Sequence, residues 1–450
     1  MNAIQRWLWM VLFGTCLCQV AVAAEGDWPQ WRGPFSDGNS SETNLPVKWD
    51  AASIVWKTEL PGIGQSSPVI SGDRIFLTAE QQRGRERIVF CVDRISRKIV
   101  WQETVWTGEP EKSHDMNGWA SATCATDGQH VVAFFGCGGL HGFTVEGKKL
   151  WSRDLGTFPG PWGTGASPVI VGSMVIQNCE AEEKASIAAF DLKTGKTIWE
   201  TSRDVPQRGG WSSPVLTHGE QRELVLNGFN GVTGYDPRNG KKLWFCKSFA
   251  GRGEPTAVPG NGVVFMLNGL QGDFYAVRPG GQGEVTSSHM AWHTPRKAGR
   301  DQPSPIVAGG VVTVVSMDGV GIGYDEKTGR ELWRDRLGGN FTSSPIAANG
   351  LVYFQSNSGE TVVIKPGEKF DVVARNALPA SGDEIFRASL TPSRGQMFSR
   401  SNKVLYSPLS RSLISATNRF ADRDLSRFGR ARGCCQVGFW TSLLSGVRRR

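Results

Sequence analysis

The stretch that decides the fold is Ala189-Phe190-Asp191-Leu192-Lys193-Thr194-Gly195-Lys196-Thr197-Ile198-Trp199. It joins an apolar strand to a second strand through a turn that begins with Asp and ends with Gly. Further copies with the same spacing contain Asp236, Gly240 and Trp244, and then Asp325, Gly329 and Trp333. Degenerate copies end at Trp101 (with Arg97 where glycine is expected), at Trp151 and, after a longer turn, at Trp292. A unit that returns along the chain in this way indicates a repeat architecture.

Each part of the unit has a physical role in a β-hairpin. The Asp carboxylate can accept backbone N–H groups at a tight turn. The Gly four residues later can take the positive φ that closes a hairpin with a bulge. The Trp then stands at a constant distance from the turn, and such an indole buries about 150–250 Å². We therefore expect these Asp, Gly and Trp residues to lie between neighbouring sheets and to hold the fold rather than to carry chemistry.

A second motif, usually Ser-Pro followed by Val or Ile, marks the beginning of each unit. The eight strand starts are Ser67, Thr123, Ser167, Ser213, Pro255, Ser304, Ser344 and Ser389. The outer-strand tryptophans are Trp56, Trp101, Trp151, Trp199, Trp244, Trp292 and Trp333. Trp56 precedes the first start and the last unit lacks an outer strand, so the segment around Trp56 is expected to complete the last sheet. The sequence thus predicts an all-β propeller of eight blades, rather than seven, closed by pairing of its N-terminal and C-terminal strands.

The Asp-x-x-x-Gly-x-x-x-Trp unit with its Ser-Pro-Val strand starts resembles the tryptophan-docking repeat of the PQQ-like β-propellers, over roughly residues 54–406. That family includes quinoprotein dehydrogenases and the outer-membrane assembly factor BamB. The resemblance implies a non-catalytic scaffold that binds a protein or ligand in the cell envelope. The alternative that it implies is a PQQ-dependent alcohol or sugar dehydrogenase, with the quinone and a calcium ion on the ring axis.

Several features that the dehydrogenase alternative implies are missing from the expected places. The resemblance to these enzymes implies a disulfide between adjacent cysteines early in the propeller. The adjacent pair in this chain, Cys434 and Cys435, follows the last blade instead. The chain has no Cys-x-x-Cys-His, Gly-x-Ser-x-Gly, His-Glu-x-x-His or P-loop motif. We therefore expect no cofactor, no metal site and no catalytic residues.

Candidate binding residues follow from propeller geometry, because the links between blades emerge on one face around the axis. The links carry His114, Asn117, Trp119, Trp162, Trp211, Arg252, Arg300, Asp301, Asn340 and Arg387, with Gln65 in the same ring. Tryptophan, arginine and amide side chains suit a peptide strand, a glycan or an anionic group. The alternative is that some of them plug the channel or pack between blades.

The ends of the chain differ in composition from the repeats. Residues 1–24 read as a secretion signal, with Arg6, an apolar run from Trp7 and small residues at Ala21 to Ala23, although an uncleaved anchor is the alternative. Residues 25–53 are an extension expected to pack on the propeller of residues 54–407. Residues 408–450 form a basic tail for which we expect disorder. We therefore expect a periplasmic or secreted monomer that has neither a lipid anchor nor, after signal cleavage, a transmembrane segment.

Charge and cysteines exclude some classes of function. The nine arginines and two aspartates of residues 411–450 carry +7 of the total of +8, and Arg6 carries the rest, so the body is neutral. Nucleic-acid binding is therefore not expected. After signal removal seven cysteines remain, without metal-ligand spacing. Cys124 and Cys137 are candidates for a disulfide across adjacent strands, and buried free thiols are the alternative.

Overall fold

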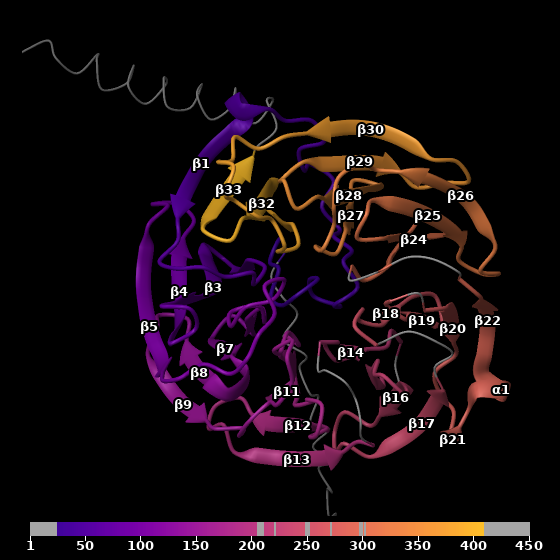
Figure 1. Cartoon of the computed structure of the whole chain (residues 1–450), viewed down its shortest axis with the longest axis horizontal. Helices are drawn as coiled ribbons and strands as arrows, with labels where there is room; N and C mark the ends of the chain where they lie inside the picture. The colour runs from indigo at the N-terminus through magenta and orange to yellow at the C-terminus, as the bar shows by residue number, and fades with distance from the viewer. Residues whose placement is uncertain are drawn as a thin grey trace, which may run out of the picture.

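The computed structural model describes residues 25–204, 211–219, 222–247, 253–270, 272–296, 300 and 303–408. Eight antiparallel sheets stand around a common axis (Figure 1). This arrangement confirms the predicted eight-bladed propeller. Several predictions lie outside the described residues: the signal peptide, the basic tail apart from residue 408, and the candidates Arg252 and Asp301. None of the described helices has the length and apolar character needed to cross a membrane.

The first four blades run in chain order, each from its inner to its outer strand. Blade 1 holds β2 (Val69–Ser71), β3 (Arg74–Gln81), β4 (Glu86–Asp93) and β5 (Ile99–Thr107). Blade 2 holds β6 (Ala125–Thr126), β7 (His130–Phe134), β8 (Leu140–Thr144) and β9 (Lys149–Arg153), with the 3₁₀ turn η2 (Gly136–Gly138). Blade 3 holds β10 (Val169–Val171), β11 (Met174–Asn178), β12 (Ser186–Asp191) and β13 (Thr197–Ser202). Blade 4 holds β14 (Val215–Leu216), β15 (Leu224–Leu226), β16 (Gly231–Tyr235) and β17 (Lys242–Lys247).

The other four blades complete the ring. Blade 5 holds β18 (Val258–Pro259), β19 (Val264–Leu267), β20 (Phe274–Val277) and β22 (Met290–Thr294). Blade 6 holds β23 (Ile306–Ala308), β24 (Val311–Val315), β25 (Val320–Asp325) and β26 (Glu331–Arg336). Blade 7 holds β27 (Ile346–Ala348), β28 (Leu351–Gln355), β29 (Thr361–Lys365) and β30 (Asp371–Asn376). Blade 8 holds β31 (Thr391–Ser393), β32 (Gln396–Arg400), β33 (Val404–Pro408) and β1 (Ile54–Glu59), which follows η1 (Ala51–Ser53).

The two ends of the propeller close blade 8 as the sequence predicts. The N-terminal strand β1 pairs antiparallel with β33, with Trp56 opposite Ser407 and Thr58 opposite Leu405. In Figure 1 the indigo β1 therefore lies beside the yellow β33. Because the outer strand comes from one end of the chain and the inner three from the other, unravelling either end breaks a complete blade.

The repeated tryptophans dock each blade onto the next. Five indoles donate from Nε1 to a carbonyl in the turn of the following blade at 2.9 to 3.1 Å: Trp101 to Val145, Trp151 to Leu192, Trp199 to Pro237, Trp292 to Glu326 and Trp333 to Gly367. The turn glycine lies directly under the ring. A Cβ on Gly240 (φ +71°) would stand 2.4 Å from the Trp199 indole. The predicted glycine thus supplies both the left-handed turn and the space for the neighbour's indole.

The turn aspartates act as the sequence predicts. Asp191 accepts the N–H of Thr194 at 2.8 Å and its hydroxyl at 2.6 Å, and Asp325 accepts the same two groups from Thr328. These hydrogen bonds, with the Thr hydroxyl as the largest cause, hold the pKa of both carboxyls below the ordinary range.

Trp244 is an exception to the docking pattern. Its indole is fully buried but donates to the Glu223 carboxylate of its own blade at 2.6 Å. The matching turn of blade 5 is the stretched one. It sends β21 (Gly283–Glu284) back to pair with β17 and then forms the short α1 (Thr286–His289). Val285 from this excursion packs in the same apolar cluster as Trp244 and replaces the usual docking turn.

The segment 25–53, here called the strap, runs across the face opposite the inter-blade links. It pairs mostly with the ends of inner strands, and Arg32 reaches as far as Pro305, at the start of β23. Its hydrogen bonds reach blades 1, 2, 3, 6, 7 and 8, through Trp28 with Ile70, Pro29 with Thr126, Gln30 with Ile170, Arg32 with Pro305, Ser40 with Ala347, and Glu42 with Gly395. The strap therefore ties together inner strands that do not pair with each other.

The cysteines of the described chain are free. Cys124 is buried, whereas Cys137 lies in η2 and is partly exposed. Cys137 donates from Sγ to the Glu111 carboxylate at 2.6 Å. A disulfide between Cys124 and Cys137 was the wrong alternative, because Cys137 belongs to a turn at the end of the sheet and not to a strand beside Cys124.

Candidate binding funnel on the propeller axis

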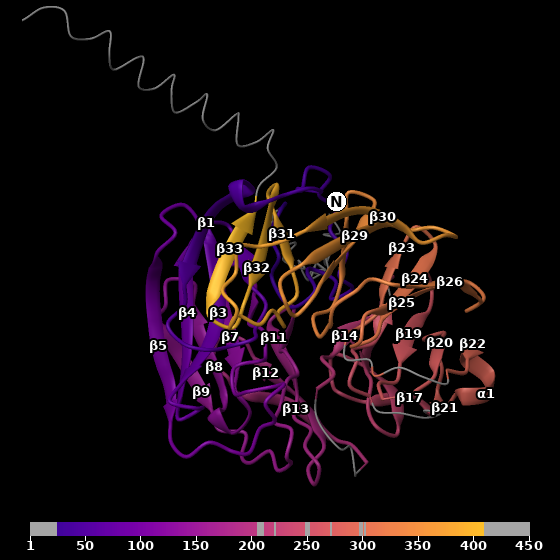
Figure 2. The same ribbon diagram turned by 45° about the horizontal axis from the view of Figure 1, so that its top comes forward.

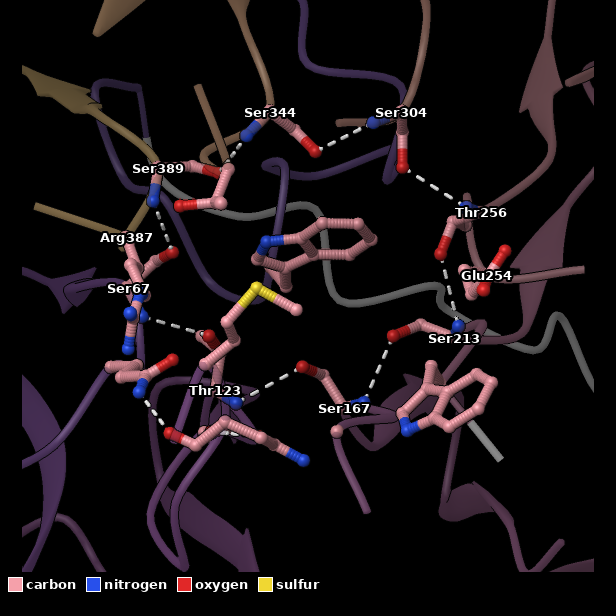
Figure 3. A pocket seen from close by; sticks show the side chains of 18 of the residues that line it. Ser67, Thr123, Ser167, Ser213, Glu254, Thr256, Ser304, Ser344, Arg387 and Ser389 are labelled. Carbon is pink, nitrogen blue, oxygen red and sulfur yellow. Dashed lines mark hydrogen bonds between the residues drawn. The ribbon is translucent and has the colours of Figure 1, made fainter. Parts of the chain in front are cut away.

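A closed ring of hydrogen bonds surrounds the axis, with one hydroxyl from each blade (Figure 3). The backbone N–H of each ring residue donates to the Oγ of the next, at 2.9 to 3.2 Å, in the order Ser67, Thr123, Ser167, Ser213, Thr256, Ser304, Ser344, Ser389 and back to Ser67. All eight are buried. The ring explains the Ser-Pro strand starts, because the hydroxyl satisfies a backbone donor that no sheet partner reaches.

The hydroxyl groups of the ring line the space inside it. All eight side chains line one cavity of about 210 Å³. Among the described residues, none of these hydroxyls donates to a protein acceptor, so each keeps one donor for whatever occupies the cavity. A ring of desolvated donors is chemically suited to an acceptor-rich group on the axis.

The cavity has a floor and an open end, and we call it the funnel. Trp31 of the strap lines the cavity, and because the strap crosses the face opposite the links, where Trp28 bonds to Ile70, we call this end the floor. Its other end is lined by link residues, among them His114, Met116 and the exposed Arg300. Figure 2 shows the ring of blades turned by 45° from the view of Figure 1. Access therefore comes from the link face.

One wall of the open end is aromatic and locked in place. The His114 imidazole stacks on the Trp162 indole with ring centroids 4.6 Å apart. Asn117 donates from Nδ2 to the Trp162 carbonyl at 2.8 Å, and Trp211 donates from Nε1 to Gly163 O at 2.9 Å. Three consecutive links are thus joined to one another, which fixes the two indoles before any ligand arrives.

Among the described residues that line the funnel, Arg300 and Arg387 are cationic and Glu254 is anionic. Arg387 donates from Nη1 to the Asp115 carbonyl at 2.9 Å, while its buried Nε has no hydrogen-bond partner in the described chain. Burial lowers the pKa of Arg387. Arg400 lies behind the ring, where it donates to Ser66 O and Thr78 O at 2.8 Å, and burial lowers its pKa to about 9. Both remain charged at neutral pH.

Seven of the predicted ring residues line the funnel: Gln65, His114, Asn117, Trp162, Trp211, Arg300 and Arg387. Trp119 and Asn340 do not. The Trp119 indole covers Gly84 and donates to Glu111 O at 2.8 Å, so it packs within blade 1 and its link. Asn340 is exposed and is not among the residues that line the funnel. Trp119 therefore packs against blade 1 instead of lining the funnel.

Several groups at the funnel were not predicted from the sequence. The ring hydroxyls were treated only as strand starts, although a hydroxyl at the same repeat position in every blade was a readable signal. Trp31, Met116 and Arg400 carried no such signal. They reach the axis only because the strap, a link and an inner sheet meet there.

The described lining does not fit a quinone with its calcium ion. Calcium takes about six to eight oxygen ligands, with carboxylates prominent among them. Glu254 is the one carboxylate among the described lining residues. Throughout the described chain, no three His, Cys, Asp or Glu side chains are grouped as metal ligands would be. No catalytic step through such a group can be derived from these residues.

Comparisons with known proteins agree with the fold. A family model described as outer membrane protein assembly factor BamB matches residues 39–161, 85–257 and 271–371. BamB of Burkholderia pseudomallei is 24% identical over 329 residues, which cover 66% of this chain and 75% of that protein.

Two solved structures show the same architecture at low identity. BamB from Moraxella catarrhalis has a TM-score of 0.59 and 15% identity, covering 80% of this chain and 97% of that one. The quinohemoprotein alcohol dehydrogenase from Comamonas testosteroni has a TM-score of 0.65 and 11% identity, covering 96% and 84%. Because the family model covers most of the propeller, the chain belongs to the BamB-type family of PQQ-like β-propellers.

Proposed function

We propose that the protein is an exported, non-catalytic scaffold of the cell envelope that binds a protein partner through the link face. The observation that carries the proposal is the preformed wall of the funnel. His114, Trp162 and Trp211 are held by stacking and hydrogen bonds around an opening flanked by arginine. Tryptophan and arginine are the residues that dominate binding energy in protein interfaces.

Two further observations support this function. The curated relative is named for outer-membrane assembly, which suits a partner in the envelope and export through the predicted signal at residues 1–24. The donor set of the funnel is poor in carboxylates, which favours the scaffold over the quinoprotein dehydrogenase that the fold also resembles. Periplasmic or secreted location, without a lipid anchor, belongs to the same proposal.

Site-specific photo-crosslinking in cells of the source organism tests the proposal. A photoreactive residue replaces Met116 or Leu270, which line the open end of the funnel. The matched control replaces Lys193, an exposed turn residue on the opposite face. One partner protein crosslinked from both funnel positions and not from Lys193 is the expected result.

The proposal fails if no protein is crosslinked from the funnel, or if the same products come from Lys193. It also fails if the purified chain, given PQQ and calcium, shows a bound-quinone spectrum and dye-linked alcohol oxidation. Either result would move the function from a scaffold to another class.

A further inference from the structure

We propose that the funnel is a carboxylate site that receives the C-terminal carboxylate of the partner's polypeptide chain. The inference rests on the proposed function, since it names the part of the partner that the link face holds. Four observations lead to it: the donors of the ring, the charge around it, the closed floor and the aromatic wall.

The ring supplies hydrogen-bond donors without competing acceptors. Each Oγ already accepts one backbone N–H, and among the described residues none donates onward. A buried hydroxyl left unsatisfied costs about 1–3 kcal/mol. A carboxylate has two oxygens with about four acceptor positions, and O–H···O⁻ bonds are roughly twice as strong as neutral ones. It therefore satisfies several ring members at once.

The charges favour an anion on one side of the ring. Arg387 has an unpartnered, buried Nε at the funnel wall, and Arg400 lies directly behind Ser66. Neither guanidinium forms an ion pair within the described chain. Two carboxylates oppose an anion here: Asp115 attracts the Arg387 guanidinium and raises its pKa against the larger effect of burial, whereas Glu254 lies beside Thr256, across the ring from Arg387 and Ser67 (Figure 3). The favourable position for a carboxylate is thus between Arg387, Ser67 and Thr123.

The floor favours a chain end in the funnel, because a polypeptide that continued along the axis would meet the strap. Trp31 lines the cavity, and the strap that carries it crosses the face opposite the links and is hydrogen-bonded to blades on both sides of the axis. The volume of about 210 Å³ is below the roughly 300–1,000 Å³ of pockets that take drug-sized ligands. A terminus can enter end-on, with its carboxylate leading and its last side chains against Trp162 and Trp211.

Calorimetric titration of the protein lacking residues 1–24 with matched tripeptides tests the inference. The probes are acetyl-Gly-Phe-Gly with a free carboxylate, the same peptide as its amide, and acetyl-Gly-Phe-Asp-amide, whose carboxylate is on a side chain. We expect the free acid to bind at least about tenfold more tightly than either amide, a difference of about 1.4 kcal/mol. Sodium acetate tests whether an anion alone suffices.

Variants link the preference to named residues. R387Q is expected to reduce the acid's affinity about tenfold and leave the amide unchanged. The matched control is R334Q, at an exposed arginine on outer strand β26, which should change neither. T123V keeps the shape of threonine but removes the hydroxyl, and should weaken the acid several-fold. T123S keeps the hydroxyl and should bind as the parent does, which separates loss of the donor from loss of packing.

Three results would overturn the inference. One is equal affinity for acid and amide, and another is acid binding that survives both R387Q and T123V. The third is binding of acetate or of the aspartyl amide as tight as that of the free acid, which would leave a general anion site. If any of these results is obtained while crosslinks from Met116 persist, the scaffold stands and only the carboxylate site is lost. If the crosslinks are absent too, both are lost.

Discussion

Replacing Gly240 with alanine should destabilise the propeller by about 2–5 kcal/mol. Gly240 has φ +71°, a region in which an L-residue costs about 1–2 kcal/mol. Its added Cβ would stand 2.4 Å from Trp199 and 2.6 Å from the Thr201 hydroxyl. Overpacking of this kind costs about 1–3 kcal/mol, because the indole must leave the position from which it donates to Pro237 O.

Gly172 provides the matched control. It also has positive φ, at +59°, but nothing lies within 4 Å of its added Cβ. G172A should therefore show only the backbone strain, about 1–2 kcal/mol. The difference between the two variants, about 1–3 kcal/mol, isolates the docking of blade 3 onto blade 4.

Equilibrium urea unfolding of the protein lacking residues 1–24, followed by tryptophan fluorescence, measures both variants. Free energies of unfolding reduced equally by G240A and G172A would refute the reasoning, because the indole contact would then contribute nothing beyond turn geometry. The same conclusion would follow if G240A left the parent stability unchanged.

Three further predictions follow from single contacts. R97G should stabilise the protein by about 0.5–1 kcal/mol, because Arg97 occupies the docking turn with φ +64°; a lower urea midpoint would contradict this. Unfolding free energy should fall as pH drops through the lowered folded-state pKa of Asp191, since the unfolded carboxyl takes up its proton first, and D191N should flatten that slope between pH 5 and 3. N376A should cost about 1–3 kcal/mol, because Asn376 accepts from Trp49 N and donates to Val47 O. Faster hydrogen exchange at residues 47–49, and not elsewhere in the chain, is the expected signature.

The repeats in the sequence predicted part of the funnel. The links were identifiable because they fall between a Trp strand and the next Ser-Pro start, and seven of their candidates line the cavity. Trp119 was misjudged because sequence places it in a link but does not say which way its indole points. Packing against Gly84 decides that, and Gly84 is in a turn of blade 1. The direction in which a side chain points depends on contacts across the fold, whereas its position along the chain can be read from the repeats.

The sequence alone determined the architecture, because its information is local and repeated. An Asp-Gly turn, an alternating strand and a Trp at constant spacing specify a hairpin, and an orphan Trp56 before the first start specifies the closure with the last blade. Only the tertiary structure decided the chemistry on the axis. The hydroxyl ring, the Trp31 floor and the buried Arg400 become one site only when eight blades bring residues from positions 31 to 400 together. No local pattern encodes that convergence, because each blade contributes a single group to it.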